Sequence, residues 1–326
     1  MMIQEEDYGL GNNKIMEVFH ILWTKPLDNL NYLKSVLKMQ FISALTIEKT
    51  YGSISIATDY KGMHLLKELG MPYKKYLTNL ENTKQEYFPA VKIEAQKEII
   101  DFNQNFLYLD YDVFINKKIN KKFSNIVQAD EGMSPNTWGL YKYCKQIGIN
   151  FTEKYNEKNI RMCNMGAFKS NKDIIYQYYN SFFENLNQSK NFINLKHPIN
   201  FSIPFLIFLE QTIIYEIFKK NNILGKVYQV YETNKPMFNE YPFIPLESDK
   251  TGIDNSKLKK LVDYSNAPIF DKWFDTPANI KKINKTNYIH LAMHKNNQII
   301  LKNLNDWALI NFPNKMKQFL NKLDKI

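Results

Sequence analysis

Two carboxylates at the end of a short apolar run are the side chains of this chain best suited to chemistry. Residues 106–115 read Phe-Leu-Tyr-Leu-Asp-Tyr-Asp-Val-Phe-Ile, and Asp110 and Asp112 form the only Asp-x-Asp in the sequence. Alternation along a strand predicts both carboxylates on one face, with Cα atoms about 6.5 Å apart. Carboxylate oxygens suit a hard divalent cation that also carries substrate phosphates. The pair therefore predicts a metal site, and a surface turn after a strand is the alternative.

The elements around this pair predict a parallel arrangement. Apolar runs at 18–23, 53–58 and 106–109 predict strands, and helical periodicity predicts helices at 29–47, at 61–69 and in a segment that opens at Pro89. This alternation predicts an α/β fold with a mixed, mostly parallel sheet flanked by helices. Ligands of such sheets bind at the carboxyl ends of the strands, which is where the two aspartates fall.

The second half of the chain is less regular. Further strands are expected at 126–129, 160–168 and 288–291, and helices at 174–186 and 205–219. Segment 134–148 is expected to be a surface helix or a loop, and segment 234–280 is expected to be a long irregular excursion of the kind that shapes substrate binding. The predicted organisation is an N-terminal extension at 1–15, two halves of one fold at 16–130 and 131–300, and a basic amphipathic tail at 301–326.

Composition limits the class of protein. A hydrophobic content of 44% excludes a disordered chain, and the net charge of +10 with an isoelectric point near 9.2 favours anionic partners. Biased codon usage explains the abundant lysine equally well. Two cysteines support neither a disulfide scaffold nor a thiolate metal cluster. The most apolar window, 201–218, carries too many polar residues for a membrane span, so a cytoplasmic protein is expected.

Four separated segments hold the remaining candidate residues: Asp110-x-Asp112, Asn164-Met165-Gly166-Ala167-Phe168, Glu210-Gln211, and His290 to Lys295. Their order and spacing, over residues 18–295, resemble the GT-A glycosyltransferases, and in layout the family 8 type that uses a nucleotide-diphosphate sugar. A GT-A-like sheet with an irregular acceptor-side region is the fold that this resemblance implies. It also makes residues 16–130 the nucleotide-sugar-binding half and residues 131–300 the acceptor-binding half of the same fold.

The first and last segments are expected to bind the metal. The resemblance implies that Asp110 and Asp112 hold Mn²⁺ or Mg²⁺, with Asp112 the more essential, and that His290 or His294 completes the protein ligands. Imidazole is a normal ligand for such ions beside carboxylates. The last segment departs from the family pattern, because Met293 stands where a glycine is expected and the lysine that follows comes one residue early. Either histidine can therefore be the ligand, and His290 is favoured by its place at a strand end.

The middle segments are expected to contact the sugars. The resemblance implies that Asn164 and Gly166 lie against the donor sugar. Glu210 and Gln211 are expected on the acceptor side, where Glu210 orients the acceptor hydroxyl or deprotonates it as a general base. A solvated helix face is the alternative for this pair. Further donor contacts are expected from Thr24, Asp59, Lys92, Tyr111 and Lys295.

The implied function is a metal-dependent hexosyltransferase of polysaccharide biosynthesis. Its expected donor is a UDP-sugar, and its expected acceptor is a glycan or a lipid-linked hydroxyl. A sugar nucleotidyltransferase of similar fold is the first alternative, but Thr24-Lys25-Pro26-Leu27 is not the glycine-rich phosphate loop of that class. A basic nucleic-acid-binding protein is the second, but a single arginine, Arg161, and dispersed lysines disfavour it, so no nucleic-acid partner is expected.

The tail is amphipathic and basic. Apolar residues from Trp307 to Leu320 alternate with lysines up to Lys325. Such a segment can lie on an anionic membrane, so peripheral attachment at the inner face of the membrane is a further expectation. A helix packed on its own domain is the alternative.

Overall fold

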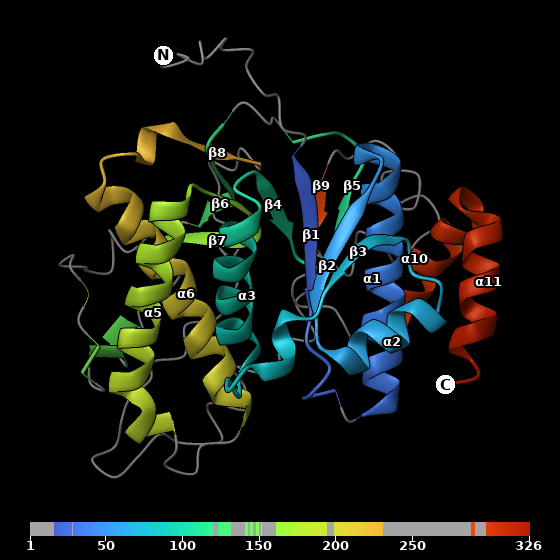
Figure 1. Ribbon diagram of the computed structural model, residues 1–326, viewed down its shortest axis with the longest axis horizontal. Helices are drawn as coiled ribbons and strands as arrows, with labels where there is room; N and C mark the ends of the chain where they lie inside the picture. The colour runs from blue at the N-terminus through green and yellow to red at the C-terminus, as the bar shows by residue number, and fades with distance from the viewer. Residues whose placement is uncertain are drawn as a thin grey trace, which may run out of the picture.

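A computed structural model of the chain has a central sheet between two groups of helices (Figure 1). The structure describes residues 16–27, 29–119, 123–131, 141–142, 144–145, 148–149, 151, 161–193, 199–230, 288–290 and 298–326. The expected N-terminal extension at 1–15 and the irregular segment at 234–280 lie outside these residues.

The main sheet of the described residues has seven strands in the order β3-β2-β1-β4-β7-β6-β8. Neighbouring strands are parallel except at β7, which runs antiparallel to both β4 and β6. A separate antiparallel ribbon joins β5 to β9. The strands are β1 (Glu17–Leu22), β2 (Ile54–Thr58), β3 (Tyr73–Leu77), β4 (Phe106–Leu109), β5 (Val113–Ile115), β6 (Asn125–Glu131), β7 (Met162–Lys169), β8 (Val227–Gln229) and β9 (Tyr288–His290).

Helices cover both faces of the sheet, and each face has its own apolar core (Figure 1). On one face lie α1 (Leu30–Tyr51), α2 (Tyr60–Glu68), α10 (Gln298–Asn311) and α11 (Pro313–Leu323). On the other lie α3 (Phe88–Phe102), α5 (Lys172–Ile193) and α6 (Ile199–Lys220). Two short 3₁₀ segments, η1 (Asn79–Asn82) and η2 (Leu224–Lys226), complete the described helices. The expected α/β fold with a mixed, mostly parallel sheet flanked by helices is confirmed.

The C-terminal helices belong to the first of these cores. The rings of Phe41 on α1 and Phe319 on α11 stack with centroids 4.0 Å apart, and Trp307 and Met316 are buried beside them. The apolar side of the tail is therefore used for packing on α1, and its contact with a membrane stays a prediction. No helix within the described ranges combines the length and the apolar character that a membrane crossing requires.

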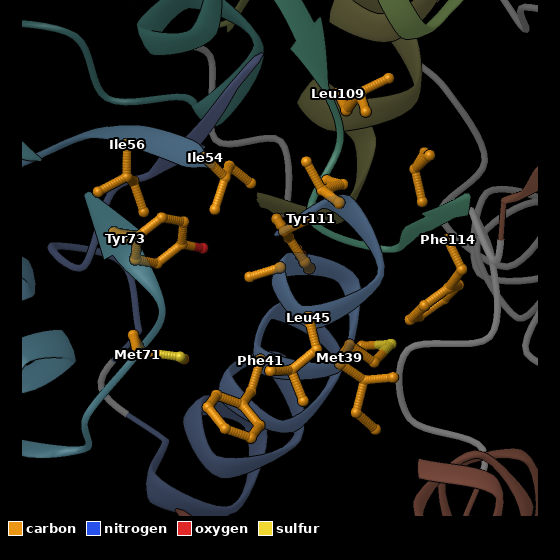
Figure 2. Close-up of a cluster of buried hydrophobic side chains, with 14 of the residues drawn as sticks. Met39, Phe41, Leu45, Ile54, Ile56, Met71, Tyr73, Leu109, Tyr111 and Phe114 are labelled. Carbon is orange, nitrogen blue, oxygen red and sulfur yellow. The ribbon is translucent and has the colours of Figure 1, made fainter. Parts of the chain in front are cut away.

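A polar network lies inside the α1-side core. His20, in the middle of β1, has no exposed surface; its Nδ1 lies 2.9 Å from the Tyr73 hydroxyl and its Nε2 lies 3.1 Å from Ser43 Oγ. The Ser43 hydroxyl donates its one proton to the carbonyl of Val113. Nε2 of His20 must therefore be the donor to Ser43, and Nδ1 must accept from Tyr73. Figure 2 shows Tyr73 among the apolar side chains of this core, which include Ile56 and Met71.

Burial fixes the charge of His20. It lowers the pKa of the imidazole from 6.5 to about 3, and the Asp112 carboxylate opposes part of that shift. The unfolded chain therefore takes up a proton below about pH 6.5 that the folded protein does not bind until about pH 3. Folding stability is thus lost as the pH falls through this window.

We predict that His20→Gln removes this loss. Between about pH 6.5 and about pH 5, the histidine is expected to lower the unfolding free energy of the wild type by roughly 1.5 kcal/mol, and this contribution is absent in the variant. Urea unfolding at both pH values measures the difference. The matched change His64→Gln, on the exposed side of α2, should leave the wild-type difference in place. An unchanged pH dependence in His20→Gln would contradict the assignment.

Candidate functional site

The candidate site lies where the strand order reverses. From β1 the chain continues to β2 and β3 on one side, whereas β4 pairs with β1 on the other. Open α/β sheets bind ligands at the carboxyl ends of the two strands that flank such a switch point. Those ends carry Thr24 after β1 and Asp110 after β4. The sheet topology therefore selects the same edge that the two aspartates predicted.

A turn follows β4 at this edge. β4 ends at Leu109, and the amide of Val113 donates to the carbonyl of Asp110 at 3.0 Å. The expectation that strand alternation places Asp110 and Asp112 on one face does not apply, because residues 110–112 are not a strand. The Asp110 carboxylate is 17% exposed, whereas Asp112 is fully buried and its charge acts on His20.

Lys92 connects three elements at the Asp110 carboxylate. The Lys92 ammonium, on α3, forms an ion pair with Glu210 Oε1 on α6 and lies 3.9 Å from Asp110 Oδ1. It also lies 5.5 Å from the ring centre of Tyr108, and the Tyr108 hydroxyl donates to Asp110 Oδ1. Burial and then the nearby Asp110 charge raise the pKa of Tyr108, so the phenol keeps its proton. Asp110 is thus held from two sides.

Glu210 is more deeply buried than a side chain on a solvated helix face. It is 2% exposed, and burial raises the pKa of its carboxyl to about 7, while the Lys92 ammonium opposes the rise. The alternative of a solvated pair is therefore wrong for Glu210. Its neighbour Gln211 is half-buried.

The second predicted segment reaches the same point through backbone contacts. The Asp110 amide donates to the carbonyl of Gly166 at 2.9 Å, which extends the ladder between β4 and β7 by one residue. The side-chain oxygen of Asn164 accepts from the Gly166 amide at 2.9 Å. Gly166 therefore lies beside Asp110 with Asn164 bonded to it, and the expected role of either residue toward a sugar stays a prediction.

The side chain of Asp59 joins the ends of β1 and β2. The Asp59 carboxylate accepts from the Thr24 amide at 2.7 Å and from the Thr24 hydroxyl at 2.8 Å. It also accepts from the Gly62 amide at 2.6 Å and so caps α2. These bonds make Asp59 a structural link and the N-cap of α2, and its expected contact with the donor stays a prediction.

β9 brings the start of the last predicted segment, His290 to Lys295, next to the turn. His290 pairs with Val113 in the ribbon of β5 and β9, so its backbone lies beside the residue that follows Asp112. His294 and Lys295 lie outside the described residues. Tyr111, expected at the donor, has its side chain in the α1-side core among Leu45, Ile54 and other apolar residues (Figure 2). Its described contacts are those of packing.

The side chains at residues 110–113 provide part of what a divalent cation needs as ligands. Within the described ranges, no three His, Cys, Asp or Glu side chains gather closely enough to hold an ion by themselves. The turn nevertheless offers the carboxylates of Asp110 and Asp112, and β9 brings the backbone of His290 next to it. Oxygen donors with one imidazole fit Mn²⁺ or Mg²⁺, with substrate oxygens completing the coordination.

Two residues of this region were not predicted from the sequence. Tyr108 lies two positions before Asp110, so strand periodicity alone could have placed it on the side of the sheet that faces α3. His20 interrupts the apolar run of β1, and a polar residue inside a buried strand is a signal of a hydrogen-bonded partner. The sequence spacing does not identify their distant partners, because Ser43, Lys92 and Tyr73 come from α1, α3 and β3.

The chain was compared with known proteins. Residues 35–251 match a family described as a family of unknown function (DUF6734). No curated protein matches the chain. Among solved structures, the glycosyltransferase GlyE in Streptococcus pneumoniae TIGR4 matches with 12% identity and a TM-score of 0.42, over 95% of this chain. The chain spans 64% of the length of that protein. An active-site mutant of LgtC matches with 12% identity and a TM-score of 0.33, over 66% of this chain and 72% of its own.

The Asp59 carboxylate that links β1 and β2 lies against Gly62, so we expect position 62 to require glycine. A Cβ there would lie 2.1 Å from Thr58 Oγ1 and 2.9 Å from Asp59 Oδ1. We expect Gly62→Ala to push Asp59 from its position and to lower the unfolding free energy by about 1–3 kcal/mol. Urea denaturation measures this loss. Gly225→Ala is the control, because a Cβ at Gly225 meets nothing within 4 Å. Equal stability of the two variants would contradict the proposed packing.

Proposed function

The chain belongs to the DUF6734 family, whose function is unknown, and we propose that it is a metal-dependent glycosyltransferase. In this proposal it moves a hexose from a nucleotide-diphosphate sugar, a UDP-sugar, to a hydroxyl of a glycan or of a lipid-linked acceptor. The observation that carries the proposal is the meeting of four separated segments at residues 110–113. Gly166 bonds to Asp110, Lys92 joins Asp110 to Glu210, and β9 pairs beside Asp112.

The position of this meeting point supports a nucleotide ligand. It lies at the switch point of an open α/β sheet, where extended ligands can reach both flanking strand ends. The ends of β1 and β2 would hold the nucleoside near Thr24 and Asp59, and the diphosphate would extend toward Asp110. Asn164 and Gly166, which lie against Asp110, would then face the sugar.

The proposed metal would be held by Asp110, Asp112 and an imidazole from His290 or His294. When bound, it would neutralise the charge that develops on the departing diphosphate. The protein residues around it would keep the carboxylates in place. Tyr108 donates to Asp110, and Lys92 supplies a buried positive charge 3.9 Å from the same oxygen. Such pre-positioned groups favour charge stabilisation, because they need no reorganisation during the reaction.

Glu210 would act in this site as a positioning residue. Its carboxylate is 2% exposed and in contact with the Lys92 ammonium, so it fixes the lysine beside Asp110. The pKa of about 7 also leaves it able to exchange a proton near neutral pH. The half-buried Gln211, which follows Glu210, would lie on the acceptor side.

We predict that UDP-sugars stabilise the protein only with Mn²⁺ or Mg²⁺. The experiment measures the thermal unfolding midpoint with a panel of nucleotides, nucleotide sugars and nucleoside triphosphates, each with and without the ion. Asp112→Asn and Asp110→Asn are expected to abolish the metal-dependent rise, because each removes one charged ligand. Asp173→Asn, which changes an exposed acid on α5, is the matched control and should respond like the wild type.

Unfolding of each variant without ligand is measured first, so that a folding defect is separated from a binding defect. An equal rise with and without metal would contradict the role of the two aspartates. A response limited to nucleoside triphosphates would contradict glycosyl transfer and favour nucleotidyl transfer. Hydrolysis or transfer of the sugar from a stabilising donor, followed by release of UDP, would then test the reaction itself.

A further inference from the structure

A polar pocket separate from the candidate site lies between α1 and α10, on the side of the sheet that α1 covers. Its volume is about 550 Å³, within the range of pockets that take small ligands. The described residues that line it are Asn31, Lys34, Ser35, Lys38, Leu301, Lys302 and Asn305. It is called the α1–α10 pocket below.

The charge of the α1–α10 pocket has one sign. Lys34 and Lys38 are four residues apart and so lie on one side of α1, and Lys302 faces the pocket from α10. No acidic side chain is among the described lining residues, and none of the three lysines forms an ion pair with a described residue. Three like charges around one cavity repel one another, and an anion in the cavity would relieve that repulsion.

Nearby lysines show that this arrangement is particular to the pocket. On the same pair of C-terminal helices and α1, Lys315 pairs with Glu48 at 2.6 Å, and Lys49 lies over the ring of Phe312 at 5.8 Å. Those lysines are used in packing the helices together. The three lysines of the α1–α10 pocket have no such use among the described residues.

Neutral polar groups accompany the charges. Asn31 and Ser35 line the pocket from α1, and the side-chain oxygen of Asn305 is buried without a hydrogen-bond partner among the described residues. An amide oxygen in that state can accept from a ligand hydroxyl. Aromatic side chains are absent from the described lining, so the pocket offers no surface on which a nucleobase would stack.

We propose that the α1–α10 pocket binds a phosphate group that carries a hydroxyl-bearing alcohol, such as a glycerol or sugar phosphate. A phosphate monoester carries about 1.5 to 2 negative charges at neutral pH, which matches three ammonium groups better than a single carboxylate does. The lysines bind the phosphate, and Asn31, Ser35 and Asn305 bind the hydroxyls. This site needs no metal, and it goes beyond the proposed transferase site because it shares none of its residues.

The place of the pocket gives it access to the same edge of the sheet. α1 begins six residues after Thr24, so its first three turns, with Lys34 and Lys38, start from the carboxyl end of β1. A phosphate-bearing molecule held there would lie toward the edge that the candidate site occupies. The same chemistry occurs in soluble alcohol phosphates and in the head groups of anionic lipids, and the experiment separates these two sources.

The first arm uses glycerol 3-phosphate and inorganic pyrophosphate, titrated calorimetrically in buffer with a chelator so that no divalent ion is present. Lys34→Gln with Lys38→Gln is compared with Lys317→Gln with Lys325→Gln, which removes the same charge from one exposed position of α11 and one exposed position just after it. The pocket variant is expected to bind at least about tenfold more weakly than the wild type, and the control less than about twofold. Lysine acetylation followed by mass spectrometry should show that the ligand protects Lys34, Lys38 and Lys302.

The second arm uses co-sedimentation with vesicles made of equal parts of phosphatidylglycerol and phosphatidylcholine, and with vesicles of phosphatidylcholine alone. If the pocket variant loses vesicle binding but keeps calorimetric binding, the source of the phosphate is a lipid head group. If it loses calorimetric binding but keeps vesicle binding, the source is a soluble phosphate. Both outcomes support the site. If the pocket and control variants weaken equally in both arms, or if the wild type binds neither probe, the proposal is overturned.

A folding defect is separated by a second variant. Lys302 is exposed on α10, so Lys302→Gln is expected to leave urea unfolding unchanged. It should nevertheless weaken the same probe. Unchanged binding in Lys302→Gln, together with unchanged acetylation of the three lysines, would also overturn the proposal.

Discussion

The arrangement of the candidate site depends on one buried charge, the ammonium of Lys92. An ammonium removed from water needs acidic partners, and it finds them in Glu210 and Asp110. These three residues come from α3, α6 and the turn after β4, so a single ion pair network sets the distance between two helices and a strand end. Loss of one partner from such a network generally costs about 3–5 kcal/mol, because the other charge stays buried. The network thus gives Asp110 a fixed position.

The direction of β7 is the second constraint. β7 runs antiparallel to β4, so its first half lies at the carboxyl end of β4. A parallel β7 would have carried Asn164 and Gly166 to the opposite edge of the sheet. The ribbon of β5 and β9 adds a third approach, since it brings a strand from near the end of the chain to Val113. Backbone pairing, more than side-chain contact, therefore gathers the segments around residues 110–113.

The sequence allowed much of the fold to be predicted. Long amphipathic helices such as α1 and strongly apolar strands such as β4 follow from periodicity, and the carboxyl edge follows from their alternation. β3 was not predicted, because its exposed Lys74 and Lys75 give it little apolar character. The antiparallel course of β7 was not predicted either, since strand direction depends on tertiary pairing. At the site, Lys92 and Glu210 were singled out separately, but no sequence pattern shows that they touch. The sequence also did not show that the ring of Tyr111, in the turn at 110–113, would lie in the apolar core.

The proposed function requires that a divalent ion and a nucleotide diphosphate bind together at the turn formed by residues 110–113. Anomalous diffraction from a crystal of the protein grown with Mn²⁺ and UDP measures this directly. We expect one manganese peak bonded to carboxylate oxygens of Asp110 and Asp112, with the diphosphate on the same ion and the nucleoside toward Thr24 and Asp59. Manganese bound elsewhere, or UDP lying away from the switch point between β1 and β4, would contradict it.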